Sequence, residues 1–175
     1  MTRYDRLSQL VRKLKPKHIV EIGTWDGRRA IELMAVTDAY YTGFDLFEEA
    51  NSDTDEKELN VKEHCDIVEV GKSIELAGFS KFVLVRGNTN KTLWETKVEP
   101  FDFCFIDGGH SVETIQNDYE WASQNIEPGG TIILDDYYTP EKVGFGCNFL
   151  EDKGTVLPYK DRVEGGHVSL LRVDA

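Results

Sequence analysis

The segment HIVEIGTWDG, residues 18–27, decides the fold of this chain. Its first residues are mostly apolar and β-branched, which is typical of a buried strand. The stretch that follows, GRRAIELMAV (27–36), repeats apolar residues at helical spacing. Gly23 allows a sharp backbone turn, and Gly27 lets the helix approach the strand closely. The segment therefore predicts a strand–turn–helix unit whose helix N-terminus points free N–H groups into a ligand pocket.

The same alternation of short β-rich runs and helical stretches continues along the chain. Further strands are predicted at YYTGFDLF (40–47), KFVLVRG (81–87), FDFCFID (101–107) and TIILDD (131–136). Helices are predicted at residues 4–14, 55–78, 89–96 and 111–126. GTVLPYKD (154–161) and HVSLLRV (167–173) are expected to form an antiparallel pair, because their connection is too short for a crossover helix. We predict one α/β domain over residues 1–175, with a doubly wound, mostly parallel seven-stranded sheet and an antiparallel C-terminal strand.

Composition narrows the classes of function. The chain has 175 residues and a formal net charge of −12, which disfavours DNA or RNA as the main partner. No apolar run approaches the ~20 residues of a membrane helix, and the basic N-terminus lacks the apolar stretch of a signal peptide. A cytoplasmic protein without a membrane partner is expected. Cys65, Cys104 and Cys147 match no metal motif and are expected to be reduced.

Asp45 is the first candidate for binding a ligand. It ends the second predicted strand, about 20 residues after Gly23, where nucleotide-binding α/β folds place an acidic residue that accepts hydrogen bonds from ribose hydroxyls. The alternative is a surface aspartate at a strand end. The glycine spacing differs from G-x-G-x-x-G, so a nicotinamide dehydrogenase is the weakest interpretation.

EIGTWDG followed by a helix, and then GFDLF, resembles motifs one and two of class I S-adenosylmethionine-dependent methyltransferases. The resemblance implies a Rossmann-like methyltransferase fold and a set of S-adenosylmethionine-binding residues. Gly23 and its neighbours would line the methionine part, Glu21 would lie near the cofactor's amino group, and Asp45 would hold the ribose. Asn88 would lie beside the adenine, although the family often has aspartate there. The implied cofactor-binding residues are Glu21, Gly23, Thr24, Trp25, Gly27, Asp45, Leu46, Asn88, Thr89 and Asp107.

Three carboxylates follow the fourth and fifth predicted strands. Asp107 ends one strand, and Asp135 and Asp136 end the other. Neighbouring strands lie ~4.8 Å apart, so these carboxylates would converge and repel one another without a cation or protons between them. Hard oxygen ligands suit Mg²⁺, Ca²⁺ or Mn²⁺. The sequence therefore predicts a divalent metal, with Mg²⁺ favoured, at Asp107, Asp135 and Asp136; the alternative is that some of them cap helices or face solvent.

His110 lies three residues after Asp107, at the start of a predicted helix. DGGH and LDD together resemble the metal-dependent O-methyltransferases of the catechol type and of the macrolide-sugar and antibiotic type. By that resemblance His110 stands where a base removes the acceptor's proton, and Asp107 and His110 are the catalytic candidates. The alternative is a histidine that caps the helix or orients a ligand.

These observations predict metal-assisted O-methylation of a small hydroxylated molecule, such as a sugar or a phenol. A metal-independent small-molecule methyltransferase and a non-catalytic cofactor-binding module on the same fold are the alternatives. The acceptor and the oligomeric state stay open, with a homo-oligomer among the alternatives.

Overall fold

The protein is described by a computed structural model that covers residues 1–60 and 63–175. Its strands form one seven-stranded sheet in the order β3-β2-β1-β4-β5-β7-β6. Strands β1 to β5 run parallel, whereas β7 runs antiparallel to both β5 and β6. The predicted fold class is confirmed. The strands are β1 (His18–Ile22), β2 (Tyr40–Asp45), β3 (Phe82–Arg86), β4 (Phe101–Ile106), β5 (Ile126–Thr139), β6 (Thr155–Val163) and β7 (Gly166–Asp174).

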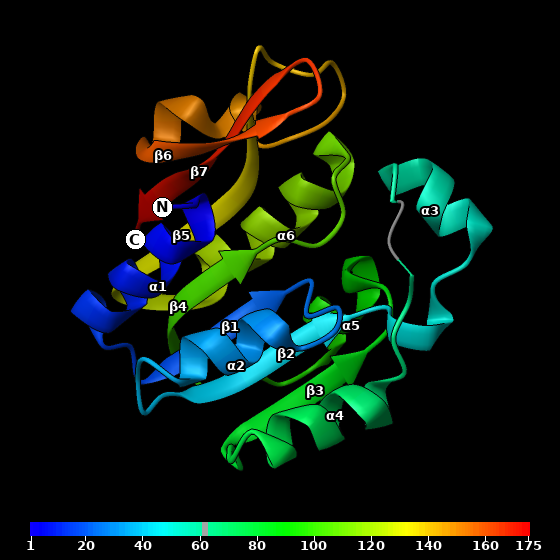
Figure 1. The fold of residues 1–175 in the computed structure, drawn as a ribbon, viewed down its shortest axis with the longest axis vertical. Coiled ribbons are helices and arrows are strands. Elements are labelled where there is room, and N and C mark those ends of the chain that lie inside the picture. The colour runs from blue at the N-terminus through cyan, green and yellow to red at the C-terminus, as the bar shows by residue number, and fades with distance from the viewer. Residues whose placement is uncertain (61–62) are drawn as a thin grey trace.

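Helices cover both faces of the sheet and bury two apolar clusters against it (Figure 1). One cluster joins α1, α2 and α4 to the sheet through residues such as Leu7, Leu33 and Ile74. The other joins α5 and α6 to the opposite face through residues such as Leu93 and Trp121. The α-helices are α1 (Arg3–Leu14), α2 (Arg28–Met34), α3 (Ser52–Glu58), α4 (Ile67–Leu76), α5 (Thr89–Glu95) and α6 (Val112–Asn125), and the 3₁₀-helices are η1 (Phe47–Glu49) and η2 (Asn148–Lys153).

The strand order reverses at β1, which lies between β2 and β4. Chain connections leave β1 and β4 toward opposite faces of the sheet, and this opens a crevice beyond their carboxyl ends. Parallel α/β sheets bind ligands at this point, so the fold places the residues that follow β1, β2 and β4 around one opening.

The long helix predicted over residues 55–78 is wrong. The structure has two shorter helices there, α3 and α4, and residues 59–60 and 63–66 between them are not helical. Val61, which the prediction placed on the apolar stripe of that helix, lies outside the described residues. α3 ends at Leu59 in a left-handed conformation, and Asp66 caps the N-terminus of α4. As a result α3 stands off the sheet, on the side toward which β1 to β4 point (Figure 1).

The three cysteines are free, as expected. None of the helices in the described ranges is both long enough and apolar enough to cross a membrane.

Trp121 of α6 packs against β2 and β4 through two aromatic contacts. Its indole stacks on Phe101 with ring centroids 5.4 Å apart and meets the edge of Phe44 at 5.9 Å. Phe44 directly precedes Asp45 at the end of β2. The packing of Trp121 therefore helps to hold the strand end that carries a predicted ligand-binding residue.

We expect Trp121→Ala to lower the free energy of unfolding by about 3–5 kcal/mol, because it leaves a cavity under β2 and β4. Urea unfolding followed by circular dichroism measures this change. Trp94→Ala is the matched control: Trp94 is 49% exposed against 4% for Trp121, and its loss is expected to cost less than about 1 kcal/mol. Equal losses in the two variants would contradict the packing argument.

Candidate functional site

A cavity of about 520 Å³ opens beyond the carboxyl ends of β1, β2 and β4. Its volume lies within the range of small-molecule and cofactor sites. Most of the predicted site residues lie in its wall, and four do not. In the wall are Gly23, Thr24, Trp25, Asp45, Leu46, Asn88, Thr89, Asp107 and His110; Glu21, Gly27, Asp135 and Asp136 are not among its lining residues.

The turn after β1 passes directly over the end of β4. Gly23 has φ +98°, and a Cβ there would lie 2.1 Å from the carbonyl oxygen of Asp107. No other residue fits this position without moving the backbone of one of the two strands. Gly23 therefore brings the main chain of the predicted cofactor-binding turn into contact with Asp107, one of the two predicted catalytic residues.

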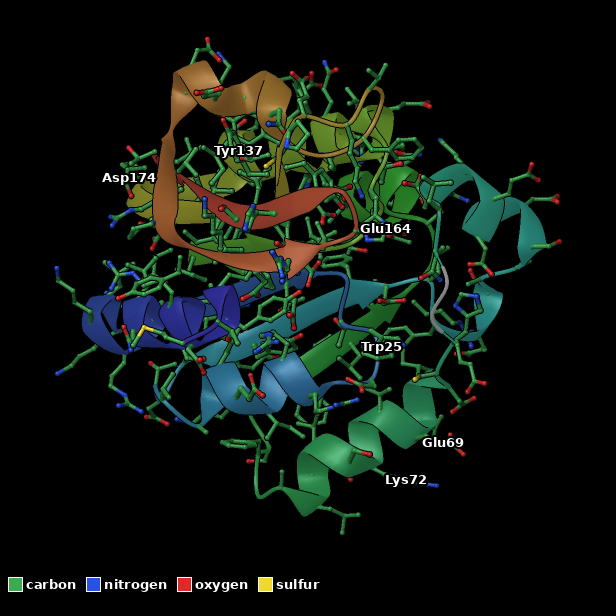
Figure 2. The ribbon with its side chains drawn as sticks, turned by 45° about the horizontal axis from the view of Figure 1, so that its top comes forward. Trp25, Glu69, Lys72, Tyr137, Glu164 and Asp174 are labelled. Atoms are coloured by element: carbon green, nitrogen blue, oxygen red, sulfur yellow. The ribbon has the colours of Figure 1, made fainter. Side chains whose placement is uncertain are left out.

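Asp45 ties the ends of β1 and β2 together. Its Oδ2 accepts a hydrogen bond from the Trp25 amide at 2.7 Å, and its Oδ1 accepts one from the Phe47 amide at 2.8 Å. Trp25 has a positive φ of 48°, and its indole N–H donates to the carbonyl oxygen of Glu63 at 2.8 Å. Figure 2 shows Trp25 near the chain that precedes α4. Each carboxylate oxygen carries a second lone pair, so the chemistry of Asp45 fits a ribose diol.

Glu21 lies beneath the glycine turn instead of in the cavity wall. Its side chain is fully buried, and the Tyr41 hydroxyl donates a hydrogen bond to its Oε2. Burial raises the pKa of Glu21 to about 8, although the hydrogen bond from Tyr41 opposes the shift. Its position near the cofactor's amino group stays a prediction. Gly27 has a packing role, because a Cβ there would lie 2.9 Å from Val70 of α4.

Asn88 and Thr89 lie where β3 passes into α5. Asn88 is the N-cap of α5, and its Oδ1 accepts a hydrogen bond from the Asn90 amide at 2.9 Å. The capping bond fixes the orientation of the side chain, whose amide nitrogen is a donor suited to a purine edge. Both residues line the same cavity as Asp45.

We call the region around Asp107, Asp135 and Asp136 the acceptor end. It contains two residues of α1 that the sequence did not single out for the site. The Arg3 guanidinium donates to both oxygens of Asp135, from Nε at 2.7 Å and from Nη2 at 2.9 Å. The Tyr4 hydroxyl lies 2.7 Å from Asp135 Oδ2 and 3.1 Å from Asp107 Oδ2. Burial raises the pKa of Tyr4 well above its usual value, and the charges of Asp107 and Asp135 raise it further. Tyr4 therefore stays protonated, and its single hydroxyl hydrogen is shared between the two carboxylates, with Asp135 the nearer.

Asp136 faces a different set of partners. It has a positive φ of 64°, at the irregularity between Leu134 and Tyr137 in the pairing of β5 with β7. The Tyr138 hydroxyl donates to its Oδ1 at 2.8 Å, and its Oδ2 lies 3.6 Å from His110 Nε2. Burial raises the pKa of Asp136, and the neighbouring charge of Asp135 adds to the shift.

The three carboxylates predicted to share a metal therefore belong to two separate groups. Asp107 and Asp135 share the Tyr4 hydroxyl, whereas Asp136 faces Tyr138 and His110. Residues 1–60 and 63–175 contain no group of three histidine, cysteine, aspartate or glutamate side chains placed to hold a metal ion. β4 and β5 are neighbours as predicted, and Asp107 and Asp135 do come together at the Tyr4 hydroxyl. Asp136, at its positive φ, contacts Tyr138 and faces His110 instead. As they stand, these residues do not fit a divalent metal.

His110 is held by a main-chain carbonyl on α3. Its Nδ1 lies 2.8 Å from the carbonyl oxygen of Glu58. A carbonyl can only accept, so Nδ1 carries the hydrogen, and in the neutral ring Nε2 carries the lone pair. The Glu58 carboxylate in turn accepts hydrogen bonds from the Ser111 amide at 2.8 Å and from the Thr114 hydroxyl at 2.6 Å. α3 is thus fastened to the N-terminus of α6 through Glu58.

Comparison with known proteins shows which family has this arrangement. A family model described as a methyltransferase domain matches residues 20–137. The chain belongs to this family. It is a class I S-adenosylmethionine-dependent methyltransferase. The matched residues run from β1 into β5 and include every cavity-lining position predicted from the motifs.

Solved structures of other methyltransferases share the fold of this methyltransferase. The O-methyltransferase NovP has a TM-score of 0.72 at 17% identity, over 98% of this chain and 78% of its own. TomG from Streptomyces achromogenes, solved with S-adenosylmethionine, has a TM-score of 0.70 at 16% identity, over 98% and 79%. A Bacillus cereus O-methyltransferase solved with S-adenosylhomocysteine has a TM-score of 0.66 at 19% identity, over 98% and 80%.

Sequence reasoning missed Arg3, Tyr4 and Glu58, which belong to α1 and α3. One signal for Arg3 was present. A cation in the first turn of a helix is disfavoured by the helix dipole, so Arg3 needs a partner elsewhere in the fold. Nothing in the sequence could identify that partner as Asp135, because the two residues are 132 positions apart.

We expect Glu21→Gln to flatten the pH dependence of the methyltransferase's stability. The folded-state pKa of Glu21 is about 8 against an ordinary 4.5, so the folded protein holds a proton that the unfolded chain releases. The wild-type free energy of unfolding should therefore fall as the pH rises through this window, and glutamine removes that contribution. Urea unfolding between about pH 5 and about pH 8 measures it. The exposed Glu75→Gln is the control, and parallel profiles for wild type and Glu21→Gln would contradict the assignment.

We expect Asp45→Asn to weaken binding of S-adenosylhomocysteine by about 10- to 100-fold, because charged hydrogen bonds contribute about 1.5–3 kcal/mol. Isothermal titration calorimetry measures the affinity. Asp38→Asn is the control, since Asp38 is exposed and pairs with Lys81 away from the cavity. Unchanged affinity in Asp45→Asn would remove Asp45 from the ribose site.

Proposed function

We propose that this methyltransferase transfers a methyl group to a hydroxyl oxygen of a small molecule, such as a sugar or a phenol. One cavity is lined by most of the predicted cofactor residues and by the predicted base, which supports a shared site for cofactor and acceptor. The solved O-methyltransferases NovP and TomG have the same fold, and TomG is involved in tomaymycin synthesis. Their similarity makes a small-molecule hydroxyl the first acceptor class to test.

In the proposal the cofactor extends along the ends of β1, β2 and β3. Asp45 accepts hydrogen bonds from the ribose, and the main chain around Gly23 and Thr24 encloses the methionine part. Asn88 and Thr89 lie beside the adenine, and Trp25 and Leu46 complete the wall. Glu21 supports the turn from beneath and lies on the side of the amino group. The cofactor's position then directs its reactive end toward Asp107 and His110.

The orientation of His110 is the observation that carries the chemistry. Hydrogen bonding of Nδ1 to the Glu58 carbonyl directs the basic Nε2 away from α3. Asp136 Oδ2 is 3.6 Å from Nε2, which is longer than a hydrogen bond. A base whose second nitrogen is oriented by a fixed acceptor is the arrangement that general-base catalysis uses. We therefore assign proton removal from the acceptor hydroxyl to His110 Nε2.

S-adenosylmethionine, when bound, supplies a methyl group on a positively charged sulfur and accepts the sulfur–carbon bonding electrons. His110 takes the hydroxyl proton as the oxygen forms its new bond to carbon. The cavity wall aligns the two reactants and excludes water, and alignment of this kind contributes a large share of rate acceleration. Asp107 lies at the junction of the two halves, where its main chain contacts Gly23.

The sequence favoured a metal-assisted form of this reaction, with Mg²⁺ at Asp107, Asp135 and Asp136. A metal-assisted reaction needs free carboxylate oxygens as metal ligands. In this structure Arg3 and Tyr4 donate hydrogen bonds to the oxygens of Asp135. We therefore propose the reaction with no metal-dependent step.

We expect His110→Asn to lower kcat by about 10²- to 10⁴-fold, because it removes the base. The asparagine amide can still donate to the Glu58 carbonyl, so S-adenosylhomocysteine binding should be unchanged. A screen of hydroxylated acceptors that reads S-adenosylhomocysteine release measures the rate.

His167→Asn is the matched control, because His167 lies on β7 and is not among the residues that line the cavity. Its kcat should equal that of the wild type. A His110→Asn variant with the wild-type kcat would reject the base assignment. Failure of every hydroxylated acceptor would reject O-methylation itself.

A further inference from the structure

The N-terminal turn of α1 contacts β5 and β6 through the side chain of Arg3. Figure 2 shows α1 beside the β6–β7 hairpin. Thr2 and Asp5 form a capping box that fixes where the helix begins, so Arg3 occupies the first helical position. A cation is disfavoured there by the helix dipole. The partly buried guanidinium of Arg3 therefore needs hydrogen-bond acceptors outside the helix.

Those partners are two carboxylates from different strands. Arg3 donates to both oxygens of Asp135 on β5, and its Nη1 donates to Asp161 Oδ2 on β6 at 2.7 Å. The Arg3 side chain is 15% exposed and that of Asp135 only 1%. Burial alone would lower the pKa of Arg3, but the charge of Asp135 and its hydrogen bonds outweigh that effect, so the guanidinium keeps its charge. The result is a bidentate ion pair that is largely shielded from water.

Tyr4 extends this arrangement to Asp107. Its ring lies between the guanidinium groups of Arg29, 3.7 Å from the ring centroid, and Arg3, at 4.3 Å, with Phe105 at its edge. The ring is therefore fixed, and its hydroxyl lies between Asp107 and Asp135. The repulsion between the two carboxylates is reduced, because the single hydroxyl hydrogen of Tyr4 lies between them and Arg3 pairs with Asp135.

This arrangement does what a metal ion would do for the carboxylates, with residues of the chain itself. A divalent ion needs deprotonated oxygens and several ligands, and it repels a guanidinium a few ångströms away. We propose that Arg3 is the fixed cation of the acceptor end, holding Asp135 where the sequence predicted a divalent metal, so that methyl transfer proceeds without one. This inference rests on the proposed function for its catalytic meaning. Arg3 is a positioning residue that acts through Asp135.

The test measures manganese binding from the electron paramagnetic resonance signal of the free ion, with S-adenosylhomocysteine present. The wild type should leave the signal unchanged at equimolar manganese. Arg3→Ala exposes the Asp135 carboxylate and removes the repelling charge, so it should bind manganese at least about tenfold more tightly than the wild type. Arg3→Lys keeps the charge and should exclude manganese, and Arg12→Ala, on the exposed last turn of α1, should match the wild type.

Calorimetric binding of S-adenosylhomocysteine shows whether each variant is folded. If Arg3→Ala does not fold, Arg3→Gln, which retains part of the stem and a donor, is judged by the same criteria. Manganese binding by the wild type would overturn the proposal, and so would an Arg3→Ala variant that binds no better than the wild type. A lysine variant that binds manganese like the alanine variant would also overturn it.

Turnover gives a second, separate measurement. With any accepted hydroxyl compound, the wild-type rate should survive a strong chelator, and loss of the rate on chelation would overturn the role of Arg3. If no hydroxyl compound is methylated, the proposed function fails instead. The manganese measurement needs no acceptor, so it still decides whether Arg3 excludes a metal.

Discussion

The contact between the turn after β1 and the end of β4 is the constraint on which the site depends. Gly23 lies so close to the carbonyl of Asp107 that any side chain would overlap it. The same turn is tied to β2, because Asp45 accepts the Trp25 amide. Three strand ends are thereby fixed relative to one another by main-chain contacts and one carboxylate. The residues that follow β1, β2 and β4 are therefore held around the same cavity.

Elements that stand off the sheet complete the site. α3 buries no residue of its own and is held by Glu58, whose carboxylate caps the start of α6 while its carbonyl orients His110. The predicted base is therefore oriented by a segment with few apolar contacts. Local stability follows the density of such contacts, so α3 should open more easily than the sheet. Glu58 therefore both orients His110 and forms part of the cavity wall.

The sequence was sufficient where local patterns determine the structure. The run HIVEIG, the strands that end at Asp45 and Asp107, and the helix over residues 111–126 all correspond to observed elements, because alternating patterns and caps act over a few residues. The parallel order then placed Gly23, Asp45 and Asp107 around one cavity. The prediction of one helix over residues 55–78 was wrong. Its apolar stripe ran on past Leu59, the C-cap of α3, and past Asp66, the N-cap of α4. The partners of Asp135 could not be predicted, because helix periodicity does not specify how α1 is oriented against the sheet.

The orientation of α1 changes the chemistry that the carboxylates can support. From the sequence, Asp107, Asp135 and Asp136 are three negative charges that require compensation, and a divalent ion is the simplest source. In the structure, different partners compensate the negative charges of the three aspartates. Arg3 and Tyr4 engage Asp135 and Asp107, while Tyr138 donates to Asp136 and burial raises its pKa. The sequence predicted a metal ion as the source of positive charge, whereas in the structure Arg3 of α1 pairs with Asp135 and also with Asp161. The charge around Asp107 and Asp135 thus depends on how α1 packs, whereas the turn after β1 is fixed by contacts with β2 and β4 that do not involve α1.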